Sequence, residues 1–280
     1  MRKTSGRIEA KFNELRDRGD SALIPYIVAG DPTLDVTRRL ILEFAGRGAD
    51  LIELGVPFSD PMADGPSNQR ASARGLAGGG TLAAILSMVA DLRKESEIPL
   101  VLFGYFNPIL HYGCERLCAD AASAGIDGML VVDLPPEEAS ELVKPARSSG
   151  IDIIHLLAPT TPLARSRMIA HTATGFLYYV SVTGVTGARA QIAADLETNI
   201  GDIRSVTSLP IGVGFGISTP TQAREISRFA DAVVVGSAIT QLIENNLGSD
   251  RLIATVGDFV ASLKAGMRAG RSRNGVAAAE

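Results

Sequence analysis

Eight short apolar segments, each followed by a longer stretch, constrain the fold of this chain more than any other feature. The segments are rich in Val, Ile and Leu and read ALIPYIVAG, DLIELGV, PLVLFGY, DGMLVVD, DIIHLLA, FLYYVSV, PIGVGFG and DAVVVGS. The stretches between them, such as LDVTRRLILEFAGRG and TPTQAREISRFAD, are amphipathic. Near-continuous apolar strands that alternate with helices are typical of a parallel sheet covered by helices.

A short repeat marks where several of these strands begin. In GADLIEL, GIDGMLVV and GIDIIHLL, a Gly stands where a helix would end in the left-handed conformation, and an Asp follows as the chain enters a buried strand. RFADAVVV is a weaker copy. No Pro/Ser-rich linker separates the units, so they favour one closed (β/α)8 TIM barrel over two domains. The alternative is an open, doubly wound sheet.

The length of 280 residues matches one large barrel domain. We expect this domain to span residues 1–267 and to include an extra N-terminal helix. In that helix Ile8, Phe12 and Leu15 recur at helical spacing and would dock on the barrel. The segment 268–280, RAGRSRNGVAAAE, is expected to be a disordered C-terminal tail.

Charge and composition exclude several classes of function. The chain has 27 basic and 31 acidic residues and a formal net charge of −4, which gives no electrostatic attraction to nucleic acid or to an anionic membrane. No apolar run approaches the roughly 18 residues that span a bilayer. The only two cysteines, Cys114 and Cys118, are four residues apart in an expected helix. We therefore expect a cytoplasmic protein whose cysteines serve helix packing.

An ionisable residue interrupts the second apolar segment. Period-two alternation places Ile52 and Leu54 on one face of this strand and Leu51 and Glu53 on the other, so that Glu53 points into the barrel. An unpaired buried carboxyl has a raised pKa, and a carboxyl that titrates near neutrality can both donate and accept a proton. The pattern predicts a general acid/base at Glu53. The alternative is a Glu satisfied by a buried structural partner.

The following loop, VPFSDPMADGP, places Asp60 and Asp64 between prolines and a glycine. Prolines restrict the backbone, and a restricted loop holds a carboxylate in position. Capping a turn is nevertheless the commoner role for an Asp in such a segment. These residue types alone leave open whether either Asp is functional.

Three glycine-bearing strand ends, SVTGVTGAR, GVGFGIS and VVVGSAI, lie in the last third of the chain. Backbone N–H groups exposed by glycine at the start of a helix can bind a phosphate without Lys or Arg, and in barrels such sites follow the seventh and eighth strands. Gly216, Gly236 and Ser237 have these positions, and Gly187 would add a third side. The pattern predicts a phosphorylated substrate, unless the glycines serve only tight turns. Residues 184–194 are expected to form a mobile lid.

Missing residue types narrow the chemistry. The five lysines fall in expected helices or in the N-terminal segment, so none is placed to form a Schiff base inside the barrel. Of three histidines, only His155 lies in a strand, where we expect an interior residue with satisfied hydrogen bonds. No clustered His/Glu set is present for a catalytic metal. We therefore expect carboxylate acid/base catalysis, with no cofactor in this chain.

The strings VPFSDPMADGP, GYFNPI, SVTGVTGAR, GFGIS and VVVGSAI, in this order and spacing, resemble the α subunit of tryptophan synthase. The similarity runs from about residue 6 to residue 266, and the first string is highly specific to that family. The resemblance implies a carbon–carbon lyase of tryptophan biosynthesis, which cleaves indole-3-glycerol phosphate to indole and glyceraldehyde 3-phosphate by retro-aldol chemistry. It also implies a heterotetramer of two such chains and two β subunits, which carry pyridoxal phosphate.

The resemblance assigns roles to particular residues. Glu53 corresponds to the family's catalytic Glu, which would protonate indole C3 and then accept the hydroxyl proton, and Asp64 to the catalytic Asp, which would bind the ring N–H. Tyr178 is expected to hold the catalytic carboxylate. The substrate-binding positions of the family are occupied by Tyr26, Phe103, Tyr105, Tyr178, Thr186, Gly187, Phe215, Gly216, Gly236 and Ser237. Asp60 and the loop of Asn107 and Pro108 resemble the face that meets the β subunit.

The chain departs from the family at Ser67 and Asn68, where Thr and an apolar or amide residue are common, and this predicts a more polar pocket edge. Three other functions remain as alternatives: a free-standing lyase, a chain that mainly activates its partner, and a sugar-phosphate isomerase of the wider phosphate-binding barrel group. Glu53 followed by the VPFSDPMADGP loop argues against the isomerase.

Overall fold

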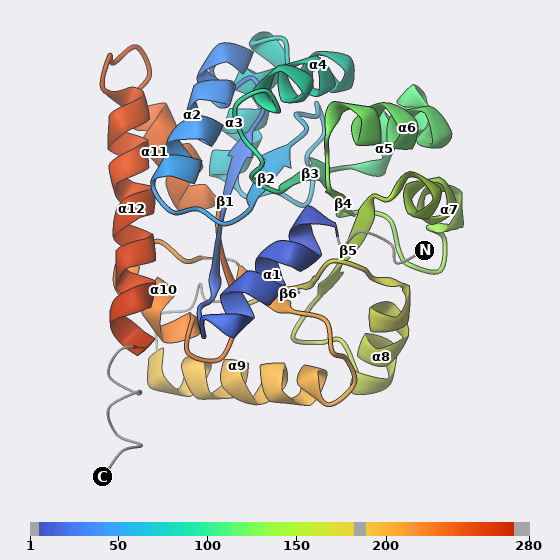
Figure 1. The fold of residues 1–280 in the computed structure, drawn as a ribbon, viewed down its shortest axis with the longest axis vertical. Coiled ribbons are helices and arrows are strands. Elements are labelled where there is room, and N and C mark those ends of the chain that lie inside the picture. Colours follow the sequence, from blue (N-terminus) through green and yellow to red (C-terminus); the bar gives the residue numbers. More distant parts are fainter. Residues whose placement is uncertain (1–5, 182–188, 215, 272–280) are drawn as a thin grey trace.

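Eight parallel strands close into one barrel in the computed structural model, which describes residues 6–181, 189–214 and 216–271. The strands follow sequence order around the barrel, and β8 pairs with β1 (Figure 1). This pairing confirms the predicted (β/α)8 barrel and makes the open-sheet alternative wrong. The strands are β1 (Ala22–Val28), β2 (Ile52–Gly55), β3 (Leu100–Gly104), β4 (Gly128–Val131), β5 (Asp152–Leu157), β6 (Leu177–Val180), β7 (Ile211–Gly214) and β8 (Ala232–Val235).

Helices surround the barrel on its outer side (Figure 1). They are α1 (Arg7–Asp17), α2 (Leu34–Gly46), α3 (Pro66–Ala77), α4 (Leu82–Leu92), α5 (Phe106–Tyr112), α6 (Cys114–Ala124), α7 (Ser140–Ser149), α8 (Leu163–Thr172), α9 (Arg189–Arg204), α10 (Pro220–Ile226), α11 (Ser237–Asn245) and α12 (Leu252–Arg271). The last helix continues past position 268, where we expected the tail to begin. The rest of that segment, 272–280, lies outside the described residues.

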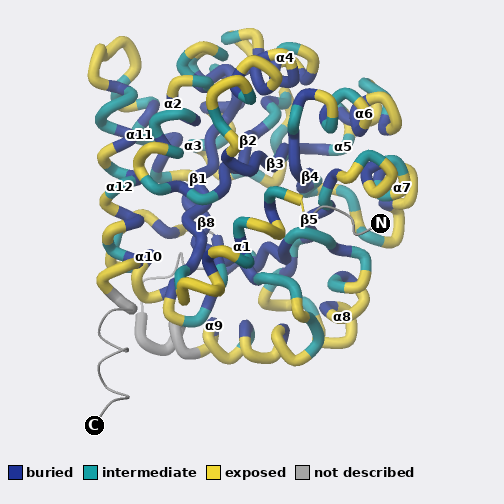
Figure 2. The backbone as a smooth tube through the Cα atoms, in the orientation of Figure 1, coloured by how far each residue is buried: buried dark blue, intermediate teal, exposed yellow. Residues whose placement is uncertain are grey.

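Strand side chains alternate between two apolar layers. Ile52 and Leu54 belong to the large cluster between the strands and the helices, whereas Leu51 and Val101 belong to a second cluster inside the barrel. Figure 2 shows the strands as the buried centre and the outward faces of the helices as exposed. The alternation predicted for β2, with Glu53 on the interior side, is confirmed.

Helix α1 covers the end of the barrel where the strands begin (Figure 1). Its residues Ile8, Phe12 and Leu15 are buried in the interior cluster, and the ring centroids of Phe12 and Phe176 are 5.6 Å apart. The predicted docking helix is therefore present, and its apolar stripe fills the bottom of the barrel.

The Gly and Asp repeat lies at this same end. Gly125 ends α6 in the left-handed conformation, with a φ of 95°. Two residues later, Asp127 accepts a 2.8 Å hydrogen bond from the N–H of Leu100, the first residue of β3. Asp231 likewise accepts a 2.8 Å bond from the N–H of Ile211, the first residue of β7. In both places, the Asp that directly precedes one strand accepts a hydrogen bond from the first backbone N–H of the previous strand in the sequence.

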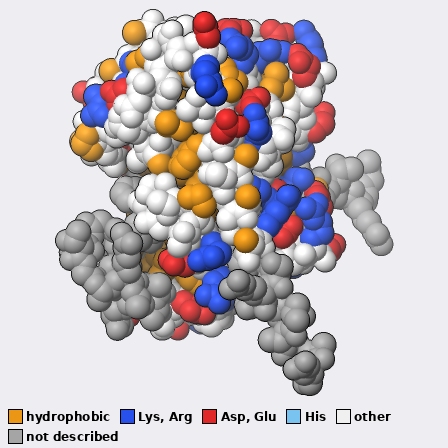
Figure 3. Space-filling model, turned by 90° about the vertical axis from the view of Figure 1, so that its left-hand side faces the viewer, with side chains coloured by type: hydrophobic (Ala, Val, Ile, Leu, Met, Phe, Trp, Pro, Cys, Tyr) orange, Lys and Arg blue, Asp and Glu red, His pale blue; other side chains and the backbone are white. Residues whose placement is uncertain are grey.

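Basic and acidic side chains are interspersed on the face drawn in Figure 3. Within the described ranges, no single helix is both long and apolar enough to cross a membrane. Helices α3 and α4 reach that length and apolar character only together, across a bend of 86°. Cys114 and Cys118 are both buried and unpaired in α6, as the helical spacing predicts.

Candidate active site

A pocket of about 280 Å³ lies at the end of the barrel where the strands finish, opposite α1. Two carboxyl groups, those of Glu53 and Asp64, face it from β2 and from the loop after β2. Its described lining consists of Tyr26, Glu53, Ala63, Asp64, Gly65, Asn68, Phe103, Val132, Leu156, Tyr178, Val180, Gly216, Val234, Gly236 and Ser237. A concave, mostly apolar site with few polar groups suits a small aromatic ligand with a polar end.

Glu53 lines this pocket from β2. In the ladder its neighbours are Tyr26 on β1 and Val101 on β3, and only 1% of its surface is exposed. Its Oε1 has no hydrogen-bond partner among the described residues. Burial raises the pKa of Glu53 to about 8 because desolvation disfavours the charged form. The predicted shift toward neutrality is confirmed, and the buried structural partner of the alternative is not found for Oε1.

Two tyrosines stand beside Glu53 and stay protonated. Burial, followed by the charge of Glu53, raises the pKa of Tyr178, and burial together with nearby Asp64 and Glu53 raises that of Tyr26. Glycines make room for both phenols, since a Cβ at Gly55 would collide with the Tyr26 hydroxyl and one at Gly214 with the Tyr178 hydroxyl. The contact in which Tyr178 was expected to hold the catalytic carboxylate is not made at Oε1.

Asp64 occupies a different environment. The Tyr105 hydroxyl donates a 2.9 Å hydrogen bond to Oδ2 of Asp64 and accepts a 3.0 Å bond from the N–H of Ala63. Burial raises the pKa of Asp64, while hydrogen bonds from Tyr105 and Asn68 lower it. Tyr105 thus stands behind Asp64 rather than in the pocket wall, and it fixes both the loop and the carboxylate.

The opposite side of the pocket presents backbone N–H groups. Gly216 follows β7 with a φ of 79°, and Gly236 follows β8 as the N-cap of α11. Gly236 has no side chain to cap the helix, and Ser237 is the first helical residue. A helix N-terminus with uncapped N–H groups attracts an anion. All three residues line the pocket, at the positions where the phosphate was expected.

Several expected site residues are not described. Thr186, Gly187 and Phe215 lie outside the described residues. The expected lid, residues 184–194, is only partly described. Its second half, 189–194, belongs to helix α9 and is not a loop.

The expected partner face is exposed. Asp60 is exposed in the loop after β2, where the nearby Met62 has 85% of its surface exposed. Asn107 and Pro108 do not form a loop as expected, because they lie in the first turn of α5. A helix can contain proline there, since the N–H groups of its first turn need no intrahelical acceptor.

Sequence reasoning missed part of the pocket wall. Four apolar wall residues each stand two positions beyond an interior strand residue, and period-two alternation could have found them: Val132, Leu156, Val180 and Val234. Asn68 was noted only as a departure from a family pattern. It lies in the first turn of α3 and lines the pocket beside Asp64.

His155 is not the satisfied interior residue that we expected. It is 7% exposed, and its Nε2 has no hydrogen-bond partner among the described residues. Burial lowers its pKa to about 4, so the ring is neutral at physiological pH. In the described part of the chain, no group of three or more His, Cys, Asp or Glu side chains is arranged to hold a metal ion.

Comparison with known proteins gives one consistent match. Residues 12–267 match the family described as tryptophan synthase alpha chain. A protein of that name from Geobacter sp. (strain M21) is 53% identical over 264 residues, which cover 94% of this chain and 98% of the relative. One from Gluconobacter oxydans (strain 621H) is 48% identical over 268 residues, covering 94% and 99%.

Solved structures agree with the sequence match. Tryptophan synthase subunit alpha from Legionella pneumophila str. Paris superposes with a TM-score of 0.88 at 36% identity, over 95% of this chain and 100% of that one. A chain of Mycobacterium tuberculosis tryptophan synthase superposes with a TM-score of 0.85 at 32% identity, over 95% and 99%.

Proposed function

Because this chain belongs to the tryptophan synthase alpha chain family, we propose that its pocket performs the retro-aldol cleavage of indole-3-glycerol phosphate to indole and glyceraldehyde 3-phosphate. The chain is then a carbon–carbon lyase of tryptophan biosynthesis. The mechanism is based on one observation: the two carboxyl groups in the pocket have different hydrogen-bond environments. Oε1 of Glu53 has no partner among the described residues, and the pKa of Glu53 is about 8, whereas Asp64 accepts a hydrogen bond from Tyr105.

The protonated Glu53 is suited to start the reaction. Near neutral pH its carboxyl group carries a proton, which it donates to C3 of the indole ring. Positive charge then develops on the ring nitrogen. Asp64, whose ionised form is stabilised by hydrogen bonds, accepts a hydrogen bond from the ring N–H and stabilises this charge.

The same Glu53 completes the cleavage. Once it has lost its proton, its carboxylate removes the proton of the side-chain hydroxyl next to the ring. The hydroxyl carbon becomes the aldehyde of glyceraldehyde 3-phosphate, and the electron pair of the broken carbon–carbon bond returns to the indole ring. Glu53 ends protonated, so the cycle neither consumes nor releases a net proton.

One side of the pocket is suited to bind the indole ring of the substrate, and the other side is suited to bind its phosphate. Phe103, Leu156 and Val180 offer an apolar wall to the indole ring. Gly216 and the N-terminus of α11 offer N–H groups to the phosphate, so that a chain of net charge −4 binds an anion through its backbone.

We further propose that the chain works with the β subunit in a heterotetramer, and that Asp60, Asn107 and Pro108 belong to the contact face. The exposure of Asp60, Asn107 and Met62 supports this. Pyridoxal phosphate would belong to the β subunit. Two unpaired buried cysteines fit a cytoplasmic location.

An assay of indole release from indole-3-glycerol phosphate tests the proposal. The purified chain should release indole, and a cognate β subunit should raise the rate. Equal rates with and without the β subunit would instead indicate a free-standing lyase. Absence of indole in both conditions would overturn the proposed function and revive the sugar-phosphate isomerase.

A further inference from the structure

A serine of helix α3 holds the backbone of the loop that follows β2. The side-chain oxygen of Ser72 lies 2.8 Å from the backbone nitrogen of Phe58 and 2.8 Å from its carbonyl oxygen. A backbone N–H only donates a hydrogen bond and a carbonyl oxygen only accepts one, so the hydroxyl accepts from the first and donates to the second. Ser72 is 5% exposed. One buried side chain therefore fixes both polar backbone groups of one loop residue.

The ring of Phe58 contacts the tyrosine that holds Asp64. The ring centroids of Phe58 and Tyr105 are 5.3 Å apart, and the two planes are tilted by 35°. The Tyr105 hydroxyl donates to Oδ2 of Asp64 and accepts from the N–H of Ala63. Because the hydroxyl is rigidly attached to the ring, a neighbour that restrains the ring also restrains the hydroxyl. Direct contacts therefore connect Ser72 with Asp64 through Phe58 and Tyr105.

Helix α3 can lie close to this loop because a glycine stands one turn after Ser72. A Cβ on Gly75 would lie 3.1 Å from Cβ of Pro57, the residue before Phe58, and 2.7 Å from the carbonyl oxygen of Ala29. A side chain at this position would push the helix away from the loop. The glycine thus allows the Ser72 hydroxyl to come within hydrogen-bond distance of the loop backbone.

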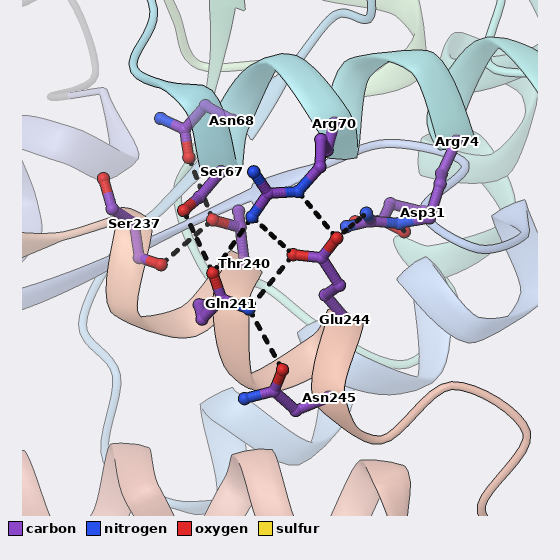
Figure 4. A network of polar contacts seen from close by, with 10 residues as sticks. All are labelled: Asp31, Ser67, Asn68, Arg70, Arg74, Ser237, Thr240, Gln241, Glu244 and Asn245. Carbon is purple, nitrogen blue, oxygen red and sulfur yellow. Dashed lines mark hydrogen bonds and ion pairs between the residues drawn. The ribbon is translucent and has the colours of Figure 1, made fainter.

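Contacts with other elements hold α3 in place (Figure 4). Arg70 of α3 binds Glu244 of α11 at 2.7 Å. Arg74 makes two hydrogen bonds, of 2.7 and 2.8 Å, with Asp31, which follows β1. These contacts do not involve the loop after β2, so α3 provides a fixed base for Ser72.

We propose that Ser72 and Phe58 are positioning residues, which hold the Tyr105 ring so that its hydroxyl orients the Asp64 carboxylate toward the ring N–H of the substrate. The inference rests on the proposed function for the role of Asp64. Neither Ser72 nor Phe58 belongs to the described lining of the pocket, so both act through Tyr105. Tyr105 donates to one oxygen of the carboxylate, and the remaining lone pairs are left for the substrate.

The titratable groups near Asp64 come from the barrel strands and the loops after them. Tyr26 and Glu53 line the same pocket from β1 and β2, and Tyr105 follows β3. Asp133, after β4, acts on Tyr105. The first turn of α3 has the sequence PSNQ and carries no charged side chain. Both positioning residues are uncharged, so their replacement adds or removes no charge beside Asp64.

A titration of Asp64 in the ligand-free chain tests the proposal without requiring turnover. The carboxyl carbon of Asp64 is followed by 13C NMR across pH in the wild type, Ser72→Ala and Phe58→Leu. Ser72→Ala removes the hydrogen bonds to the loop backbone, whereas Phe58→Leu keeps them and removes the aromatic ring. Both should move the Asp64 midpoint to higher pH, because the Tyr105 donor to its charged form is less well placed.

An unchanged midpoint in either variant would overturn the proposal. Phe58→Leu decides the question also if Ser72→Ala does not fold, because it leaves the hydrogen bonds of Ser72 in place.

Ser166→Ala is the matched control. Ser166 is likewise a buried serine in a helix, 2% exposed, but its hydroxyl donates to the carbonyl oxygen of Pro162 at the start of α8, at 3.3 Å. Its Asp64 midpoint should equal that of the wild type. An equal shift in Ser166→Ala would overturn the proposal, because the shift would then follow from lost stability and not from the position of Tyr105.

The double variant Ser72→Ala/Tyr105→Phe shows whether Ser72 acts through the Tyr105 hydroxyl. Without that hydroxyl, the position of the ring no longer affects a hydrogen bond to Asp64. The double variant should therefore have the same Asp64 midpoint as Tyr105→Phe. A further shift in the double variant would overturn the proposal, because Ser72 would then act on Asp64 by another route.

Kinetics provide the second readout. A misplaced Asp64 carboxylate stabilises less of the charge that develops on the indole ring, so kcat should fall roughly three- to tenfold in Ser72→Ala and in Phe58→Leu. The change in KM should be smaller. A raised KM with an unchanged kcat would contradict a positioning role. If the wild type releases no indole, the proposed function fails, while the NMR midpoints still decide whether Ser72 and Phe58 position Asp64.

Discussion

The hydroxyl of Tyr105 donates a 2.9 Å hydrogen bond to Oδ2 of Asp64, and Oε1 of Glu53 in the same pocket has no such donor among the described residues. A hydrogen bond from Tyr105 therefore stabilises the ionised form of Asp64, whereas no such bond from a described residue stabilises the ionised form of Glu53 at Oε1. Burial raises the pKa of both carboxyl groups, that of Glu53 to about 8, but in Asp64 hydrogen bonds from Tyr105 and Asn68 act against the rise. Pairs of carboxyl groups in opposite environments divide acid and electrostatic roles in enzymes.

The pH dependence of kcat/KM should be bell-shaped. Activity should fall above about pH 8 because Glu53 loses the proton that it donates to the substrate. It should also fall in acid as Asp64 becomes protonated. Tyr26 and Tyr178 do not produce the alkaline limb, since the pKa of each is raised above its usual value.

The variant Tyr105→Phe should shift the acid limb of this pH profile and leave the alkaline limb in place. Loss of the hydroxyl removes a donor to the charged form of Asp64, so the acid limb should move to higher pH while the alkaline limb stays in place. Steady-state rates of the wild type and the variant across pH 5 to 10 measure both limbs. An alkaline limb that moves with Tyr105→Phe would contradict the assignment to Glu53.

Glu53→Gln should make the protein more stable at high pH. The pKa of Glu53 is about 8 in the folded chain and near 4.5 when unfolded, so the folded state holds a proton that the unfolded state releases between these values. The free energy of unfolding of the wild type therefore falls as pH rises from about 4.5 to 8, by an amount on the order of a few kcal/mol.

Urea denaturation at pH 5 and pH 9 measures this effect. The wild type should lose more stability between the two pH values than Glu53→Gln does. Glu115→Gln, at an exposed position of α6, is the control and should follow the wild type. Identical pH dependence in all three proteins would show that Glu53 is not shifted.

Gly216→Ala should weaken binding of the phosphorylated substrate. The φ of Gly216 is 79°, where a side chain costs about 1 kcal/mol and displaces the backbone that faces the phosphate. We expect KM to rise several-fold with a smaller change in kcat. Gly248→Ala is the matched control, since its φ is 75° and a Cβ there would meet open space. An unchanged KM in Gly216→Ala would remove Gly216 from the phosphate site.

Much of the fold and the inward position of Glu53 were predictable from the sequence, because both depend on local patterns. Apolar runs at regular intervals predicted the eight strands, and alternation within one strand turned Glu53 inward. Thr240 and Asn68 show what local patterns leave out: they meet across 172 residues, and nothing near either residue indicates the other. The choice of Asp64 over Asp60 required the family resemblance, since both lie in similar turns. In the structure only Asp64 faces the pocket, held by the distant Tyr105.

Arg74→Met should destabilise the chain strongly. Arg74 makes two hydrogen bonds with Asp31, whose side chain is fully buried, and its loss would leave that carboxylate without its cation. We expect a loss of about 3–5 kcal/mol in the free energy of unfolding. Arg70→Met, where the side chain is 48% exposed, should cost about 1 kcal/mol or less. Equal losses in the two variants would contradict this account of the Asp31 site.

The rate of indole formation from saturating indole-3-glycerol phosphate by the wild type and by Glu53→Gln tests the central claim most directly. Gln can neither donate the proton to C3 nor accept the hydroxyl proton, so the variant should be slower by roughly 10³-fold or more. Calorimetry should show that it still binds the substrate. A variant that releases indole at a rate near that of the wild type would contradict acid/base catalysis by Glu53.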